Sequence, residues 1–173
     1  HTFPGGFDCL PDTEQSLREP TGLRIAASEE FDDTGDFTWE AWVKPVASAE
    51  RQDIIARYDH MSDWTAGAFT LCIDDGTLKF EKNGAGSIPP AGETSLANGQ
   101  WQHVALRVEA DTDGADDTVT LFVDGRPGYS TNTFDVGAAL PSYLYTAVGT
   151  TFYGNMDEIS VWSVARTDQQ ILN

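Results

Sequence analysis

The sequence predicts an all-β protein, built as an antiparallel sandwich of two sheets. Apolar and polar residues alternate through several short segments, which is the period of a strand with one buried face. Glycine, proline and aspartate separate these segments at short intervals, as is typical of sandwiches. Only one short stretch near the C-terminus has a helical signature. The 173 residues suit a single domain over residues 1–173.

The first half of the chain contains four predicted strands. Residues 37–44 alternate, and Pro45 ends the segment because it has no backbone N–H to donate. Residues 53–58 follow, with Ile54 and Ile55 at the centre. Residues 69–74 and 78–80 form a hairpin, since Asp75-Gly76 between them accepts the positive φ of a tight turn.

The second half contains four more strands. Residues 101–108 and 119–124 are separated by a polar loop, and Asp124-Gly125 predicts a second tight turn. Residues 144–148 and 156–162 complete the set. Residues 167–170 fit a capping box in which Thr167 is the N-cap and Gln170 reaches back to it, so we expect about one turn of helix.

Charge excludes several partners. The chain has 28 acidic and 10 basic residues, a formal net charge of −18. Such a surface repels nucleic-acid backbones and anionic membranes. The acidity leaves three interpretations open: a solvated, salt-tolerant surface, divalent cation binding by a few carboxylates, or a basic partner. Because the chain begins at His1, we expect it to be a mature or excised part of a longer protein.

The two cysteines, Cys9 and Cys72, leave two alternatives open. A bridge between them would close a long loop and stabilise the fold by about 4 kcal/mol. Alternatively, Cys72 is a small buried side chain and Cys9 is incidental.

Four motifs carry a resemblance to a known family. Residues 35–45 read GDFTWEAWVKP, residues 99–105 read GQWQHVA, residues 118–125 read TVTLFVDG, and residues 154–162 read GNMDEISVW. In this order they resemble the laminin-G-like domains of the concanavalin A-like lectin/glucanase superfamily, to which pentraxins are related. The resemblance spans about residues 21–170, and residues 1–20 match it less well.

The resemblance implies a concanavalin A-like jelly roll that recognises carbohydrate or protein, often with Ca²⁺. It implies a secreted or cell-surface setting within a multidomain chain. By this resemblance Asp157 is the first candidate for a structural Ca²⁺ ligand, with Asp8 on the opposite wall where the first and last strands meet. Hard Ca²⁺ favours several oxygen ligands. The alternative for Asp157 is a strand-end carboxylate paired with a cation or a backbone N–H.

The sequence does not predict an enzyme. Glucanases of this scaffold place carboxylates at alternate positions of one strand, where acid and nucleophile flank the glycosidic bond. Asp157 and Glu158 are adjacent, so in a strand they point to opposite faces. No nucleophile, phosphate-binding or zinc-protease motif is present in the sequence.

The strongest candidate for ligand binding is an aromatic-rich loop. Tyr58, His60 and Trp64 would stack on sugar rings, and Asp59 and Asp63 would accept hydrogen bonds from hydroxyl groups or hold a rim Ca²⁺. The alternative is that Trp64 folds back over the sandwich edge. A second aromatic set near the other end of the chain includes Tyr143 and Tyr153.

Two tryptophans and a histidine are expected to be structural. Trp101 and Trp162 lie in strands flanked by apolar residues, which predicts core positions. His103 lies in mid-strand and is expected to be hydrogen-bonded. The sequence thus predicts a non-catalytic module that binds a glycan. A protein-binding adhesion domain and a polysaccharide-degrading enzyme are the alternatives.

Overall fold

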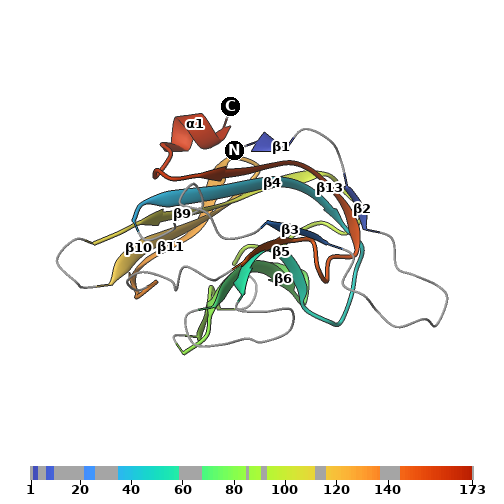
Figure 1. Ribbon diagram of the computed structural model, residues 1–173, viewed down its shortest axis with the longest axis horizontal. Helices are drawn as coiled ribbons and strands as arrows, with labels where there is room; N and C mark the ends of the chain where they lie inside the picture. Colours follow the sequence, from blue (N-terminus) through green and yellow to red (C-terminus); the bar gives the residue numbers. More distant parts are fainter. Residues whose placement is uncertain are drawn as a thin grey trace.

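The computed structural model describes residues 2–3, 7–9, 22–25, 35–58, 68–84, 86–90, 93–111, 116–136 and 145–172. In this part of the chain, two antiparallel sheets pack face to face and a short helix lies on one of them (Figure 1). The predicted all-β sandwich is therefore confirmed. No helix among these residues is long and apolar enough to span a bilayer.

One sheet has seven strands. Its order is β1 (Thr2–Phe3), β13 (Gly154–Trp162), β4 (Phe37–Pro45), β9 (Gln102–Glu109), β10 (Asp117–Val123) and β11 (Arg126–Phe134), and β2 (Phe7–Cys9) also pairs with β13. The N-terminal strands thus meet the last strand of the chain, as the family resemblance implies.

The other sheet has six strands. Its order is β3 (Leu23–Ile25), β12 (Tyr145–Val148), β5 (Gln52–Tyr58), β6 (Phe69–Asp74), β7 (Thr77–Lys82) and β8 (Gly86–Ile88). Strand β5 is joined to β6, and β6 to β7, by direct antiparallel pairing.

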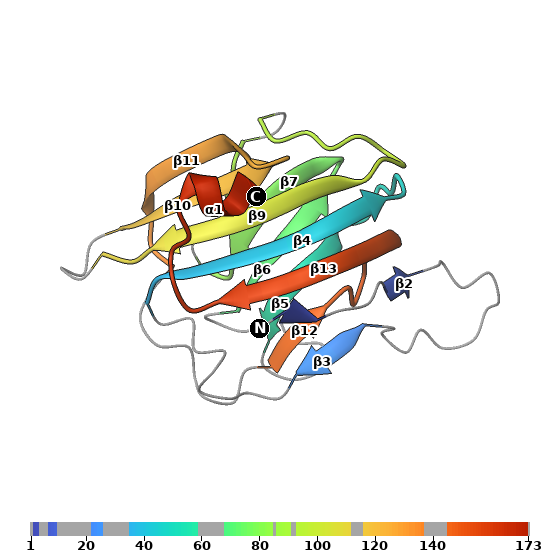
Figure 2. The ribbon, with the colours of Figure 1, turned by 90° about the horizontal axis from the view of Figure 1, so that it is seen from above.

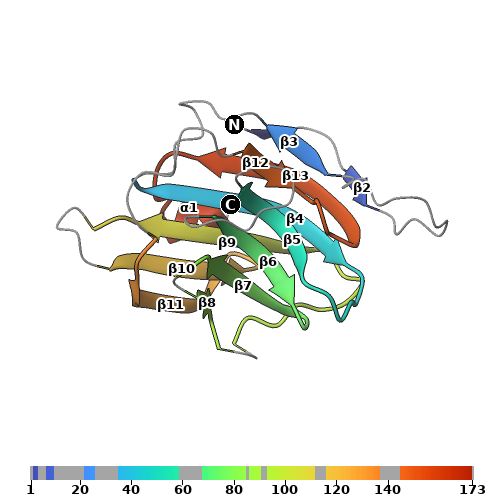
Figure 3. The ribbon, with the colours of Figure 1, turned by 60° about the horizontal axis from the view of Figure 1, so that its bottom comes forward.

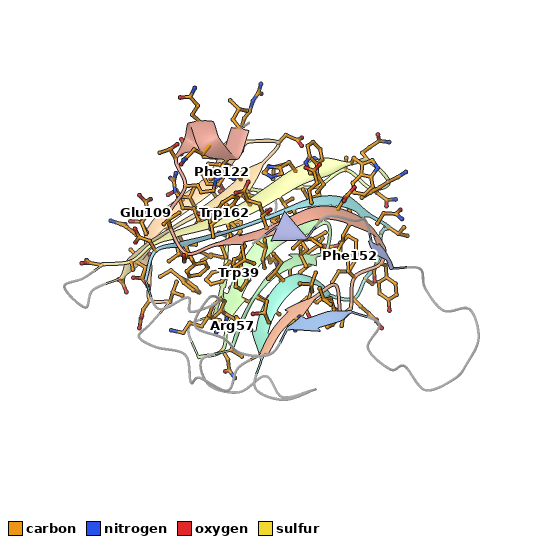
Figure 4. The ribbon with its side chains drawn as sticks, turned by 45° about the horizontal axis from the view of Figure 1, so that its top comes forward. Trp39, Arg57, Glu109, Phe122, Phe152 and Trp162 are labelled. Atoms are coloured by element: carbon orange, nitrogen blue, oxygen red, sulfur yellow. The ribbon has the colours of Figure 1, made fainter. Side chains whose placement is uncertain are left out.

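Aromatic rings from both sheets meet in the core. The Trp39 ring of β4 lies 5.2 Å from the Phe69 ring of β6, and Phe37 lies 5.8 Å from the same ring. Phe80 of β7 contacts Phe69 edge-on at 5.6 Å. Figure 4 shows Trp39 between the two sheets. The alternation predicted for residues 37–44 is confirmed, because its odd-numbered apolar side chains are all fully buried.

Both predicted tight turns are present. Asp75 and Gly76 have φ of 47° and 69°, and Asp124 and Gly125 have φ of 51° and 70°. Two successive positive φ values match the right-handed twist of the flanking strands, and glycine adopts them without steric cost. The sequence therefore located both hairpins correctly.

The core positions predicted for Trp101 and Trp162 are wrong. Trp101 is 45% exposed, and Trp162 is only partly buried, with the Arg166 guanidinium 4.6 Å above its ring. The side chains of β9 that face the core between the sheets are at the even-numbered positions 104, 106 and 108, so Trp101 shares the outward parity of His103. Flanking apolar residues gave no information about which face each tryptophan occupies.

The proposed disulfide is not formed, because Cys72 is a free, buried thiol. Cys72 lies on β6 of the six-stranded sheet, whereas Cys9 pairs with Gly154 on the seven-stranded sheet. Leu71 and Ile73 point into the core, so Cys72 points to the opposite side of its sheet, away from β2. Burial, together with the nearby carboxylates of Glu81 and Asp53, raises the pKa of the Cys72 thiol well above its usual value.

Helix α1 (Asp168–Leu172) lies on the outer face of the seven-stranded sheet, over β9 and β10 (Figure 2). Ile171 packs there against Ala105 and Phe122. The capping box is confirmed: the Gln170 amide donates to Thr167 Oγ1 at 3.3 Å, and the Thr167 amide donates to Gln170 Oε1 at 2.8 Å.

A buried carboxylate fixes the segment that leads into this helix. Glu40 of β4 accepts hydrogen bonds from Arg166 Nη1 and from His103 Nε2, the latter at 3.3 Å. His103 is therefore a partnered structural residue, as predicted. Burial raises the pKa of the Glu40 carboxyl, but the hydrogen bonds from His103 and Arg166 lower it by more, so its pKa lies below the usual value.

We predict that Glu40→Gln destabilises the fold by about 2 kcal/mol at neutral pH, because it removes a buried charged acceptor from two partly buried donors. A carboxyl with a lowered folded-state pKa stabilises above its unfolded pKa, and this contribution is lost as the pH falls through the folded-state pKa. Urea unfolding of both proteins across pH 7 to 3 should show the difference shrinking below about pH 4. Glu109→Gln is the control, since Glu109 pairs with Arg107 but is about half exposed. A difference that is independent of pH would contradict the role of the charge.

Candidate functional site

The six-stranded sheet carries the candidate ligand-binding region at one of its ends, and Figure 3 shows its outer face. The side chains at the centre of this outer face, among them Thr70, Cys72 and Ala56, are fully buried. Leu71 and Ile73 of β6 belong to the core, so Thr70 and Cys72 lie on the outer face. The strand register places Ala56 beside Thr70, Asp53 beside Cys72, and the β7 residues Lys79 and Glu81 on the other side of them.

At one end of this sheet lie the strand residues from which the two predicted aromatic segments continue. Tyr58, the last residue of β5, is directly opposite Tyr145, the first residue of β12. Chain segments 59–67 and 137–144 therefore join the sheet at adjacent positions of the same end. The predicted binding residues Asp59, His60, Asp63, Trp64 and Tyr143 belong to these segments and lie outside the described residues.

Tyr153 is at the other end of the sheet. Its amide donates to Gln52 Oε1 at 3.0 Å, and its hydroxyl donates to Glu50 at 3.4 Å. Gln52 begins β5 and Tyr58 ends it, so about 20 Å of strand separates them. Of the sequence-based set of binding residues, the two described members, Tyr58 and Tyr153, therefore lie at opposite ends of one sheet.

A network of charged residues connects the start of β5 to β7. Arg51 Nε lies 3.1 Å from Asp53 Oδ1, and its Nη1 lies 2.9 Å from Glu81 Oε2. The Asp53 carboxylate, only 2% exposed as a residue, also accepts hydrogen bonds from the hydroxyls of Thr70 and Thr151, each at 3.1 Å. This network holds the start of β5 against its neighbours.

The sequence carries a signal for one part of this network. Residues 77–82 alternate polar and apolar, which places Thr77, Lys79 and Glu81 on one face. Lys79 Nζ is 2.5 Å from Asp74 Oδ2, and this hydrogen bond raises the pKa of Lys79. The connection from β5 to β7 through Arg51 depends on which strands are neighbours, which the pattern alone does not give.

Asp53 and Glu81 lie on the same face of the six-stranded sheet and can be compared with a glycosidase pair. They lie on strands β5 and β7, which flank β6. Inverting glycosidases separate their two carboxyls by about 6.5–9.5 Å and leave both free to face substrate. Here the same guanidinium engages both carboxylates, and two hydroxyls occupy Asp53 further. The arrangement suits an ion-pair network that stabilises the sheet.

The two predicted Ca²⁺ ligands lie on neighbouring strands. Asp8 of β2 is opposite Asn155 of β13, and Asp157 is two residues further along β13. Asp157 Oδ1 accepts a hydrogen bond from the Glu158 amide at 2.8 Å, at a bulge where Glu158 has a φ of 47°. No three His, Cys, Asp or Glu side chains gather anywhere in the described part of the chain. Since Ca²⁺ takes six to eight oxygens, these residues make up only part of such a site.

Comparisons with known proteins agree with this architecture. A sequence model of the concanavalin A-like lectin/glucanases superfamily matches residues 19–172. The chain therefore belongs to this superfamily, in its laminin-G-like branch. No curated protein sequence matches it significantly.

Solved structures share the fold at low identity. Domain 4 of the extracellular GH43 arabinanase AbnA from Geobacillus stearothermophilus, solved with arabinotriose, has a TM-score of 0.62 and 18% identity, with 87% of this chain and 70% of that chain covered. A SAP-like pentraxin from Limulus polyphemus has a TM-score of 0.61 and 16% identity, covering 99% and 78%. The CBM40 module of the IT-sialidase from Ruminococcus gnavus, bound to α2,3 sialyllactose, has a TM-score of 0.58 and 14% identity, covering 87% and 94%.

We predict that Ca²⁺ raises the melting temperature of the EDTA-treated protein, because a cation bound only by the folded state stabilises it. Asp157→Asn should abolish the shift, since the amide oxygen still accepts the Glu158 N–H but the ligand charge is lost. Differential scanning calorimetry measures both effects. An unchanged midpoint in the wild-type protein would rule out the proposed cation site.

Proposed function

We propose that this domain is a non-catalytic carbohydrate-binding module, with its ligand site at the Tyr58 end of the six-stranded sheet. The observation that carries the proposal is the register of Tyr58 opposite Tyr145. It brings the loop that begins at residue 59 and the segment that ends at residue 144 to one end of one sheet. Membership of a lectin and glucanase superfamily supports the assignment to sugars.

The chemistry of the two segments suits a sugar. The apolar C–H faces of a sugar ring stack on aromatic side chains, and its hydroxyls need well-placed hydrogen-bonding groups. Tyr58, His60 and Trp64 supply rings, with Tyr143 from the second segment, and Asp59 and Asp63 supply acceptors. The solved relatives that bind arabinotriose and sialyllactose support this class of ligand.

We place the module outside the cell, in a longer chain where it holds a neighbouring domain on a glycan. The arabinanase is extracellular, and the part of it that resembles this chain is its domain 4. A Ca²⁺ ion at Asp157 and Asp8 would stabilise the edge formed by β2 and β13, on the other sheet from the proposed sugar site.

We predict that Trp64→Ala weakens glycan binding at least tenfold, because it removes an aromatic stacking surface. Glycan-array binding followed by isothermal titration calorimetry with arabinotriose and sialyllactose measures the effect. Trp64→Phe is the matched control, since a smaller ring still stacks and should retain most of the affinity. Full binding by a folded Trp64→Ala protein would contradict the site, and a protein partner that free sugars do not displace would favour an adhesion domain.

The non-catalytic assignment predicts no release of reducing ends from a panel of arabinans, glucans and sialylated glycans. Each digest is compared with a heat-denatured blank, and the Asp53→Asn and Glu81→Gln variants are assayed beside it. Release that disappears in both variants would assign catalysis to this acid pair and overturn the proposal.

A further inference from the structure

The outer face of the seven-stranded sheet carries two exposed tryptophans. Trp42 is 38% exposed and Trp101 is 45% exposed. In the described residues the other exposed large apolar side chains are Val46, Val164 and Leu172. Single exposed apolar side chains are common, whereas neighbouring ones indicate an interaction surface. Neither tryptophan belongs to the core or to the end of the six-stranded sheet discussed above.

The register places both indoles on the same face and close together. Trp42 of β4 is opposite His103 of β9, and Val43 is opposite Gln102. Trp101 directly precedes β9, and extending this ladder by one pair would set it opposite Lys44, which makes Trp101 and Trp42 diagonal neighbours on one face. Side chains related in this way are about 7–8 Å apart at the backbone, within mutual reach of aromatic rings.

The helix leaves this part of the sheet open. In Figure 2, α1 lies toward the end at which β4 begins and β9 ends. Trp42 is three residues before the last residue of β4, and Trp101 directly precedes β9. The two tryptophans are therefore at the opposite end of the face, beyond the helix.

Polar groups lie beside each indole. On one side Trp42 is opposite Asp157 of β13, and on the other it contacts the His103 ring at 5.5 Å, tilted by 57°. The contact of His103 with Glu40 fixes the imidazole ring, so this ring supports Trp42 in a defined orientation. In the next row Asn155 of β13 is opposite Lys44. Carboxylate, amide and ammonium groups thus surround two aromatic faces.

This composition distinguishes between occupants. The centre of a protein interface is a continuous apolar patch that is poor in charge. Here charged residues interrupt the apolar surface, and two indoles are too little to form such a centre. A sugar needs this combination, an aromatic face for its C–H surface and hydrogen-bonding groups around the rim. The formal net charge of −18 disfavours anionic glycans.

We infer that Trp42 and Trp101 form a second carbohydrate-binding surface, specific for neutral polysaccharides, on the sheet opposite the proposed Tyr58 site. Two surfaces on opposite sheets make the module bivalent, so that one domain holds two chains or two positions of a folded polymer. Bivalent attachment raises the effective concentration at the second site and slows release from an insoluble polysaccharide.

Native affinity electrophoresis tests this surface, with soluble linear arabinan and a soluble β-glucan as neutral probes and a polyuronate as the anionic probe. The variants are Trp42→Ala/Trp101→Ala, Trp64→Ala and the triple variant. Val164→Ala is the control for loss of an exposed apolar side chain of the same molecule. Far-ultraviolet circular dichroism and the melting temperature of each variant establish that it is folded.

We expect Trp42→Ala/Trp101→Ala to weaken retention by a neutral polysaccharide about tenfold. We expect Trp64→Ala to leave residual retention, and the triple variant to migrate as in a gel without polysaccharide.

Complete loss of retention in Trp64→Ala alone, with Trp42→Ala/Trp101→Ala unaffected, would overturn the second surface and leave the Tyr58 site standing. Loss only in Trp42→Ala/Trp101→Ala would support this surface and count against the Tyr58 site. Stronger retention by the polyuronate would overturn the neutral specificity. Sedimentation that shows a wild-type dimer, abolished in Trp42→Ala/Trp101→Ala, would assign the tryptophans to self-association and overturn the inference.

Discussion

The stacked rings of Phe37, Trp39, Phe69 and Phe80 join the two sheets, and the rest of the structure depends on this contact. Each ring occupies an inward position of its strand, so the strand register is fixed: a slip by one residue would turn the aromatic set toward solvent. Once the inward faces are fixed, the outward faces are fixed as well. The placement of Tyr58 opposite Tyr145 and of Trp42 opposite His103 follows from the same constraint.

The two outer faces are organised differently. On the six-stranded sheet, Arg51, Asp53 and Glu81 form an ion-pair network across three strands. On the seven-stranded sheet, Glu40 fixes the chain before α1 through Arg166, and α1 then covers only part of the face. Charge therefore serves structure in both places, while the exposed side chains of Trp42 and Trp101 lie at the end of the seven-stranded sheet that α1 does not cover.

Sequence alone predicted the sandwich, both tight hairpins and the capping box, because each depends on local alternation or on local turn chemistry. It assigned Trp101 and Trp162 to the core wrongly, because apolar neighbours do not reveal parity; counting from Val104 would have shown it. Arg51 was not recognised, because its two acidic partners are brought together only by the order of β5, β6 and β7. Tyr153 was grouped with Tyr143 by nearness in the chain, but the fold places it beside Gln52.

The free thiol of Cys72 can report local opening of the six-stranded sheet. The side chain is fully buried at the centre of β6, and its raised pKa keeps it protonated, so it does not react with thiol reagents while the sheet is intact. Labelling at this position then measures how often the structure around β6 opens. In a Cys9→Ser variant, slower labelling of Cys72 in the presence of a sugar would show that ligand bound at the Tyr58 end reduces local opening at the centre of the sheet.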